Sequence, residues 1–156
     1  MNHAEMDEPQ RKTALTQLNT ILETELAGVV RYTHYALMVY GYNRIPIVSW
    51  LKANATEGLD HAHRAGELVT LLGGHPSLKI GPLLETARHD IGDILRESLE
   101  HERASLSAYY ALLSSVEGRS VLLEDYARQM IASEELHLDE VNKMLRRPGE
   151  TEPFDG

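Results

Sequence analysis

Cysteine is absent from the sequence, so disulfide bonds and thiolate metal ligands are both excluded. Any bound metal must therefore be held by nitrogen and oxygen atoms, which favours iron, manganese or zinc over an iron–sulfur cluster. Long apolar runs are also missing. No stretch approaches the roughly 20 apolar residues of a membrane span, and the N-terminal stretch MNHAEMDEPQRK lacks the character of a signal peptide. We therefore expect a cytoplasmic protein with no membrane partner.

Positive charge is scarce. The chain has 15 lysine and arginine residues against 24 aspartate and glutamate residues, which gives a formal net charge of −9. Binding of nucleic acid requires a concentrated basic surface, so nucleic acid is not an expected partner. A protein this rich in carboxylates attracts cations instead.

Aromatic residues and long β-branched runs are also few, with one phenylalanine and one tryptophan in 156 residues. The many leucine, alanine, glutamate and arginine residues favour helix. Apolar residues recur at three- and four-residue spacing and are interrupted at glycine and proline, which predicts four helices in one domain. We expect these helices over residues 12–42, 46–72, 90–116 and 120–146. They form a bundle over residues 12–146, between a flexible N-terminus (1–11) and a flexible tail (147–156).

The three connections between these helices differ in length. The first and third are short, so each joins two antiparallel neighbours. The second has about 15 residues and reaches about 50 Å when extended, whereas a helix of about 27 residues is about 40 Å long. It can cross the whole bundle and let the second and third helices run in the same direction. The predicted fold is all-α, a ferritin-like four-helix bundle with one long crossover between the second and third helices.

A two-metal site in such a bundle takes one acid from each of two helices. Each of the other two helices supplies a glutamate and, one turn later, a histidine. Spacing of three or four residues places both side chains on one face. The candidate metal ligands are Glu25, Glu57, His61, Glu102, Glu134 and His137. Tyr32 lies two turns after Glu25 on the same face and is the candidate catalytic residue, as a hydrogen-bond donor or a one-electron donor.

Each candidate also has an ordinary structural alternative. A single Glu-x-x-His motif is weak support for a metal site, Glu25 alone is compatible with an ion pair, and Tyr32 is compatible with a core residue. Among the other histidines, we expect His3, His34, His75 and His89 on the surface or in loops, and His63 and His101 beside the site without clearly facing it. The metal-site hypothesis depends on the combination of one acid per helix, two histidines on the appropriate helices and one long crossover.

The stretches LNTILETELAGVVRYTHYAL and HAHRAGELVTLLGGHP, with the motif EELH in the last helix, resemble bacterioferritin over roughly residues 15–145. The resemblance implies a ferritin-like di-iron protein. It also implies iron ligands at five of the candidate positions and a tyrosine near the iron pair at Tyr32. The five positions are Glu25, His61, Glu102, Glu134 and His137.

Three departures separate the chain from that family pattern. Gly58 occupies the position of a bridging glutamate, and Leu59 occupies the position of the methionine that binds haem, so haem is not expected. The short fifth helix that helps to close a cage is missing, which puts mineral storage in doubt. Glu57 stands one residue before Gly58. Either its side chain swings into the site, or a π-bulge restores its register, or the site has lost this ligand.

We expect a ferroxidase that oxidises Fe(II) with O2 or peroxide at a di-iron centre and that forms a homo-oligomer, at least a dimer. Manganese or zinc are possible substitutes for iron. Two alternatives stay open. One is a di-metal oxidase or peroxide scavenger that stores no iron, and the other is a non-catalytic helical interaction protein with a vestigial site. A DNA-protecting miniferritin is the least favoured alternative, because QRK is a very small basic patch.

Overall fold

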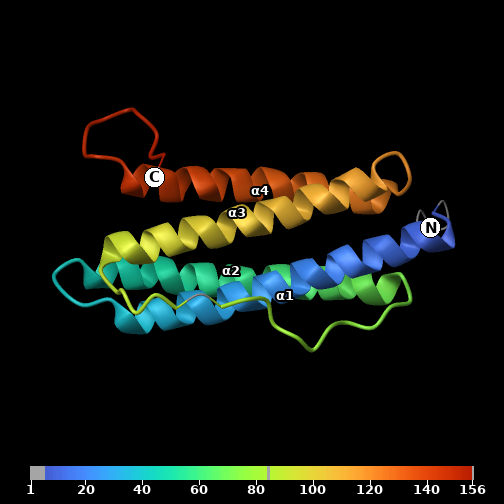
Figure 1. Ribbon diagram of the computed structural model, residues 1–156, viewed down its shortest axis with the longest axis horizontal. Helices are drawn as coiled ribbons and strands as arrows, with labels where there is room; N and C mark the ends of the chain where they lie inside the picture. The colour runs from blue at the N-terminus through green and yellow to red at the C-terminus, as the bar shows by residue number, and fades with distance from the viewer. Residues whose placement is uncertain (1–5, 84, 156) are drawn as a thin grey trace.

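The computed structural model describes residues 6–83 and 85–155. Within these residues it contains helices and no strand: α1 (Glu8–Met38), α2 (Arg44–Leu71), α3 (Ile91–Val116) and α4 (Val121–Leu145). Helices α1 and α2 form one antiparallel pair and α3 and α4 form another (Figure 1). The crossover, residues 72–90, returns along α1, so α2 and α3 run in the same direction. The predicted all-α bundle with one long crossover is therefore confirmed.

Helix α1 begins at Glu8, four residues before its predicted start. The Asp7 side chain accepts a hydrogen bond from the backbone N–H of Gln10 at 2.8 Å, and the Gln10 side chain accepts one from the N–H of Asp7 at 3.0 Å. This reciprocal cap satisfies donors that the first turn would otherwise leave free. The helix also ends earlier than predicted, at Met38, where Val39 is extended. Capping, which the apolar periodicity does not report, sets both the early start and the register of the first turn. Residues 1–5 of the predicted flexible N-terminus lie outside the described residues.

Two apolar clusters fill the two ends of the bundle. The larger cluster includes Leu18, Val69, Leu112 and Leu123, and the smaller cluster includes Val39, Leu51 and Ile94. A layer of buried polar side chains lies between them. An unpaired carboxylate or imidazole is costly at such depth, so this layer requires partners or cations.

The crossover is fastened to α1 along its length. Ser77 donates to the Glu23 carboxylate at 2.6 Å, the N–H of Gly81 donates to the Glu23 carbonyl at 2.9 Å, and Arg31 donates to the Pro82 carbonyl at 3.2 Å. The Thr86 hydroxyl donates to Glu97 on α3. These contacts hold the described parts of the connection against the bundle.

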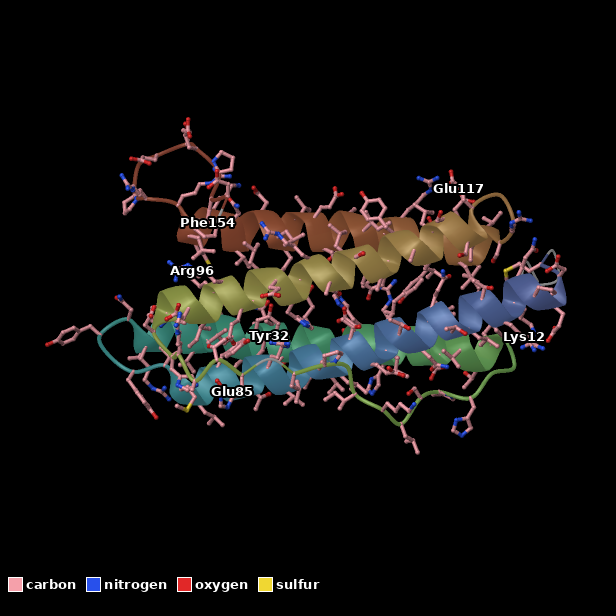
Figure 2. The ribbon with its side chains drawn as sticks, in the orientation of Figure 1. Lys12, Tyr32, Glu85, Arg96, Glu117 and Phe154 are labelled. Carbon is pink, nitrogen blue, oxygen red and sulfur yellow. The ribbon has the colours of Figure 1, made fainter. Side chains whose placement is uncertain are left out.

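The C-terminal tail folds back onto α4 and α3. Phe154 exchanges two hydrogen bonds with the Asn142 side chain, and the Arg96 guanidinium lies 5.9 Å from the Phe154 ring centroid (Figure 2). None of the described helices combines the length and the apolar character that a bilayer span requires.

Candidate metal centre

The polar layer encloses a small cavity of about 20 Å³ to which all four helices contribute. This volume holds about one water molecule and excludes an organic substrate, so the site suits small ions. The residues that line the cavity are Gly28, Tyr32, Asn54, Glu57, Gly58, His61, Glu102, Glu134 and His137.

One group of ligand atoms gathers around His61. Its Nδ1 lies 3.1 Å from Glu25 Oε2 and 3.8 Å from Glu134 Oε1. One ligand atom from each of these three residues lies within 4.8 Å of the other two. Glu25 and Glu134 are buried, with 5% and 4% of their surface exposed. The group has the ligand types and the spacing of one metal position.

A second group gathers around Glu102. Its Oε1 lies 3.5 Å from His137 Nε2, it accepts a hydrogen bond from the Tyr32 hydroxyl, and it lines the same cavity as Glu134. The central layer therefore holds one three-residue ligand group around His61 and, across the same cavity, the Glu102–His137 pair.

Glu57 lies at the solvent edge of the cavity, with its side chain 49% exposed. Its Oε1 is 3.5 Å from His61 Nε2, whereas Glu25 faces the other ring nitrogen, Nδ1. A carboxylate in this position orients a metal-binding histidine through the nitrogen that the metal does not use. The direct metal role of Glu57 stays a prediction, and its contact with His61 Nε2 suits an orienting role instead.

Helix α2 is a continuous α-helix from Arg44 to Leu71, so the π-bulge considered near Gly58 is wrong. A Cβ atom at Gly58 would lie 3.3 Å from Val29 Cγ2 and 3.5 Å from the Glu25 carbonyl oxygen. Gly58 therefore lets α2 lie close against α1 at the level of the site. The close contact between the two helices explains why a glycine, and not a larger residue, suits position 58.

Substitution of Glu57 separates its two roles. Because an orienting carboxylate typically contributes about 10- to 100-fold to metal affinity or activity, we expect Glu57→Gln to weaken Fe(II) binding within that range without abolishing it. Isothermal titration under anaerobic conditions measures this change. Asp60→Asn, on the exposed side of the same turn, is the matched control. Complete loss of binding in Glu57→Gln would instead identify a direct ligand.

Further side chains hold the candidate ligands in place. Ser105 and Tyr109 donate to Glu25 Oε1 at 3.0 and 3.3 Å. The Trp50 ring stacks on His137, with centroids 6.0 Å apart and an interplanar angle of 10°. Sequence analysis missed Ser105 and Trp50. The signal for Ser105 was its position three residues after Glu102, on the same helical face.

Asn54 was also missed. Asn54 is buried at the cavity, and its Nδ2 has no hydrogen-bond partner among the described residues. Asn54 could have been predicted from its position seven residues, or two helical turns, before His61, which places both side chains on one helical face. His101, expected beside the site, is buried against Tyr32 and fills the space over Gly28, where a Cβ atom would lie 2.6 Å from its Nε2. Burial lowers the pKa of His101, which favours a neutral ring.

The pKa shifts in the buried polar layer indicate an excess of negative charge that a cation would balance. Burial, followed by the hydrogen bond with Glu102 and its charge, raises the pKa of Glu134 to about 12. Burial opposes a charge on His61, but Glu25 and Glu57 outweigh it and raise the pKa of His61. Without a metal the cluster must take up protons, which metal cations would replace. Glu134 Oε2 and His137 Nε2 are buried without hydrogen-bond partners within the described part of the chain, as atoms reserved for a metal would be.

The fold and the site together define a class of protein: a four-helix bundle whose helices surround a buried cluster of carboxylates and histidines. The model of the ferritin-like domain family matches residues 15–148, and the chain therefore belongs to that family.

Many solved structures are similar to this chain, and two of them illustrate the match. The first is a crystal structure described as that of ferritin-like, diiron-carboxylate proteins from Bacillus anthracis. It is 22% identical, with a TM-score of 0.84, over 90% of this chain and 100% of that chain. The other is a dodecameric thioferritin, the bacterioferritin-related protein from Bacteroides fragilis. It is 22% identical, with a TM-score of 0.81, over 92% of this chain and 89% of that chain. At 22% identity, these two matches show that the fold is shared and show nothing about function. No curated protein matches the sequence.

Proposed function

We propose that this protein is a ferroxidase, a di-iron protein that oxidises Fe(II) with O2 or peroxide. The observation that carries the proposal is that Glu134, 3.8 Å from His61 Nδ1 in the Glu25–His61 group, lines the same cavity as Glu102 and His137. A carboxylate shared by two nitrogen- and oxygen-rich groups is the chemistry of a two-metal centre in a helical bundle.

The residues fit this metal pair by charge as well as by type. Four carboxylates lie in or beside the cavity, from Glu25, Glu57, Glu102 and Glu134. With both histidines neutral, two divalent cations balance their four negative charges. Because all ligands are nitrogen and oxygen atoms, iron is the metal we propose, with manganese or zinc as substitutes.

In the proposed mechanism, bound iron supplies the one-electron chemistry, and the protein supplies position and charge. Ser105 and Tyr109 hold the Glu25 carboxylate through its Oε1, so that its Oε2 faces His61. Tyr32 fixes Glu102 by a hydrogen bond. Burial, followed by the nearby Glu102 charge, raises the pKa of Tyr32, so its hydroxyl keeps the proton that it donates. The apolar clusters on both sides restrict bulk water.

Anaerobic titration with Fe(II), followed by addition of O2 or hydrogen peroxide, tests this function. We expect about two tightly bound Fe(II) ions per chain and rapid appearance of ferric absorbance on addition of the oxidant. Failure to bind Fe(II) would contradict the proposal and would favour the helical interaction protein. Binding without oxidation would contradict the ferroxidase activity alone.

Storage is a separate question from oxidation, and the size of the assembly addresses it. The similar protein from Bacteroides fragilis is a dodecamer. We propose that this chain also forms a homo-oligomer, and a hollow shell of many subunits would support storage. A dimer in solution, measured by light scattering, would favour an oxidase or peroxide scavenger that stores no iron. The cytoplasmic location stays a prediction.

A further inference from the structure

A second group of metal-ligating side chains lies outside the bundle, where the crossover passes α1. His34 Nε2 lies 2.9 Å from Glu85 Oε2, and His89 Nε2 lies 3.6 Å from Glu85 Oε1. One ligand atom from each of the three residues lies within 4.8 Å of the other two. Figure 2 shows Glu85 on the crossover beside α1, whereas Tyr32 lies between the helix pairs.

This group is separate from the central cluster. His34 follows Glu25 by nine residues, which places it about 14 Å further along α1 and about 180° around the helix. The two sites therefore lie on opposite faces of α1. No residue that lines the central cavity belongs to the outer group.

We propose that His34, Glu85 and His89 form a mononuclear site for a divalent transition-metal ion, with Zn(II) as the best match. Two imidazoles and one carboxylate are a common three-residue zinc set, which leaves a fourth position for water or another ligand. Ligand atoms about 2.0–2.1 Å from a tetrahedral zinc ion lie about 3.3 Å apart. The observed separations of 2.9 and 3.6 Å bracket this distance.

The two imidazoles have nitrogen atoms that hydrogen bonding leaves free. Nε2 of His34 and Nε2 of His89 are each shielded from solvent and lack a hydrogen-bond partner within residues 6–83 and 85–155. The contact between His34 and Glu85 is close, but it does not have the direction of a hydrogen bond. Their rings pack edge to face with centroids 5.6 Å apart. Two solvent-shielded imidazole nitrogens that converge on one carboxylate have the atom types of a metal ligand set.

The crossover is shaped so that Glu85 and His89 meet His34. Ala87 has a φ of +57°, a left-handed conformation that is uncommon for a residue with a side chain. This turn brings the Ala87 N–H onto Glu85 Oε1, and the Thr86 hydroxyl anchors the turn to Glu97 on α3. A ligand set fixed in this way before binding loses less conformational entropy when a metal arrives.

A hollow of about 220 Å³ lies beside the group, lined in part by His34 and Glu85. It leaves room for the fourth ligand of the metal. Arg31 also lines this hollow, and its guanidinium donates to Tyr35 Oη at 3.3 Å and to the Pro82 carbonyl at 3.2 Å. A metal bound here would connect the crossover, through Glu85 and His89, to α1, through His34.

Counting of bound Zn(II) tests the proposal. The full-length protein and the double variant His34→Ala/His89→Ala are dialysed against the same free Zn(II) concentration, and the bound metal is measured per chain. We expect the wild-type protein to bind one more Zn(II) ion than the double variant. Because the difference between the two proteins is counted, the result does not depend on how many ions the central cluster holds.

Two further variants complete the test. His75→Ala removes an exposed histidine from the same crossover and should bind as much Zn(II) as the wild-type protein. Glu85→Gln keeps the size of the side chain and should weaken the extra site at least tenfold. Equal Zn(II) content and affinity in the wild-type protein and the double variant would overturn the proposal and leave a surface ion pair. Circular dichroism checks that the variants, whose side chains are partly exposed, keep the helical fold.

Discussion

Glu134→Ala is expected to lower the rate of Fe(II) oxidation by about 100-fold or more. The substitution removes the one carboxylate common to both proposed metal positions. Removal of side chains that only orient ligands already costs about 10- to 100-fold, and loss of a shared ligand should exceed this. Stopped-flow absorbance of the ferric product, with O2 and separately with hydrogen peroxide, measures the rate.

The neighbouring Glu135→Ala provides the matched control. Glu135 is exposed on α4 and accepts a hydrogen bond from the Tyr110 hydroxyl at 2.6 Å. It carries the same charge on the same helix but faces away from the cavity, so its loss should leave the rate near that of the wild-type protein. Undiminished oxidation in Glu134→Ala would reject the two-metal assignment.

The second large effect concerns stability. Glu134→Gln should stabilise the metal-free protein at pH 7, by at most about 3 to 4 kcal/mol. The pKa of the Glu134 carboxyl rises from 4.5 in the unfolded chain to about 12 in the fold, so folding at pH 7 requires uptake of a proton. The free energy of that uptake is about 1.4 kcal/mol for each of the 2.5 pH units between 4.5 and 7. Glutamine fills the same space without this term.

The sign of the pH dependence follows from the same shift. A carboxyl group with a raised pKa has no destabilising effect below its unfolded value. Its destabilising effect then grows as the pH rises from about 4.5 toward the folded value. The metal-free wild-type protein should therefore lose stability from pH 4.5 to pH 7 relative to Glu134→Gln. Denaturant titrations at both pH values measure the difference.

Bound metal should make the wild-type protein more stable than Glu134→Gln, the reverse of the order expected without metal. A divalent ion at one hundred times its dissociation constant stabilises the folded state by about 2.7 kcal/mol per site. Mn(II) or Zn(II), which avoid oxidation during the measurement, should stabilise the wild-type protein more than Glu134→Gln, which still gains stability because both proteins keep the proposed outer site at His34, Glu85 and His89. Equal stabilisation of both proteins by metal would contradict a metal role for Glu134, and a less stable metal-free Glu134→Gln would contradict the raised pKa. Glu135→Gln serves as the control for charge.

The bundle and the candidate ligands were predictable because both follow helical periodicity. Apolar spacing reports which face of a helix is buried, and the spacing of Glu134 and His137 places both on that face. The long connection from Leu72 to Asp90 then determined the direction of α3. These are local features of the chain, which a sequence displays directly.

Other features depend on helix capping, side-chain orientation or irregular backbone, and they were missed because apolar periodicity reports none of these. The start of α1 depends on the Asp7 cap. The orientation of Glu57 depends on which nitrogen of His61 faces Glu25. The convergence of His34 with Glu85 depends on the left-handed turn at Ala87, and no periodicity predicts that turn. The positions of these residues therefore depend on capping, irregular backbone and side-chain rotamers, which the sequence pattern does not show.

Anomalous diffraction from crystals soaked anaerobically in Fe(II) tests the central claim most directly. We predict two iron peaks in the central cavity, one beside Glu25 and His61 and the other beside Glu102 and His137, with the Glu134 carboxylate in contact with both. Absence of iron from the cavity, or a single peak that Glu134 does not contact, would contradict the account.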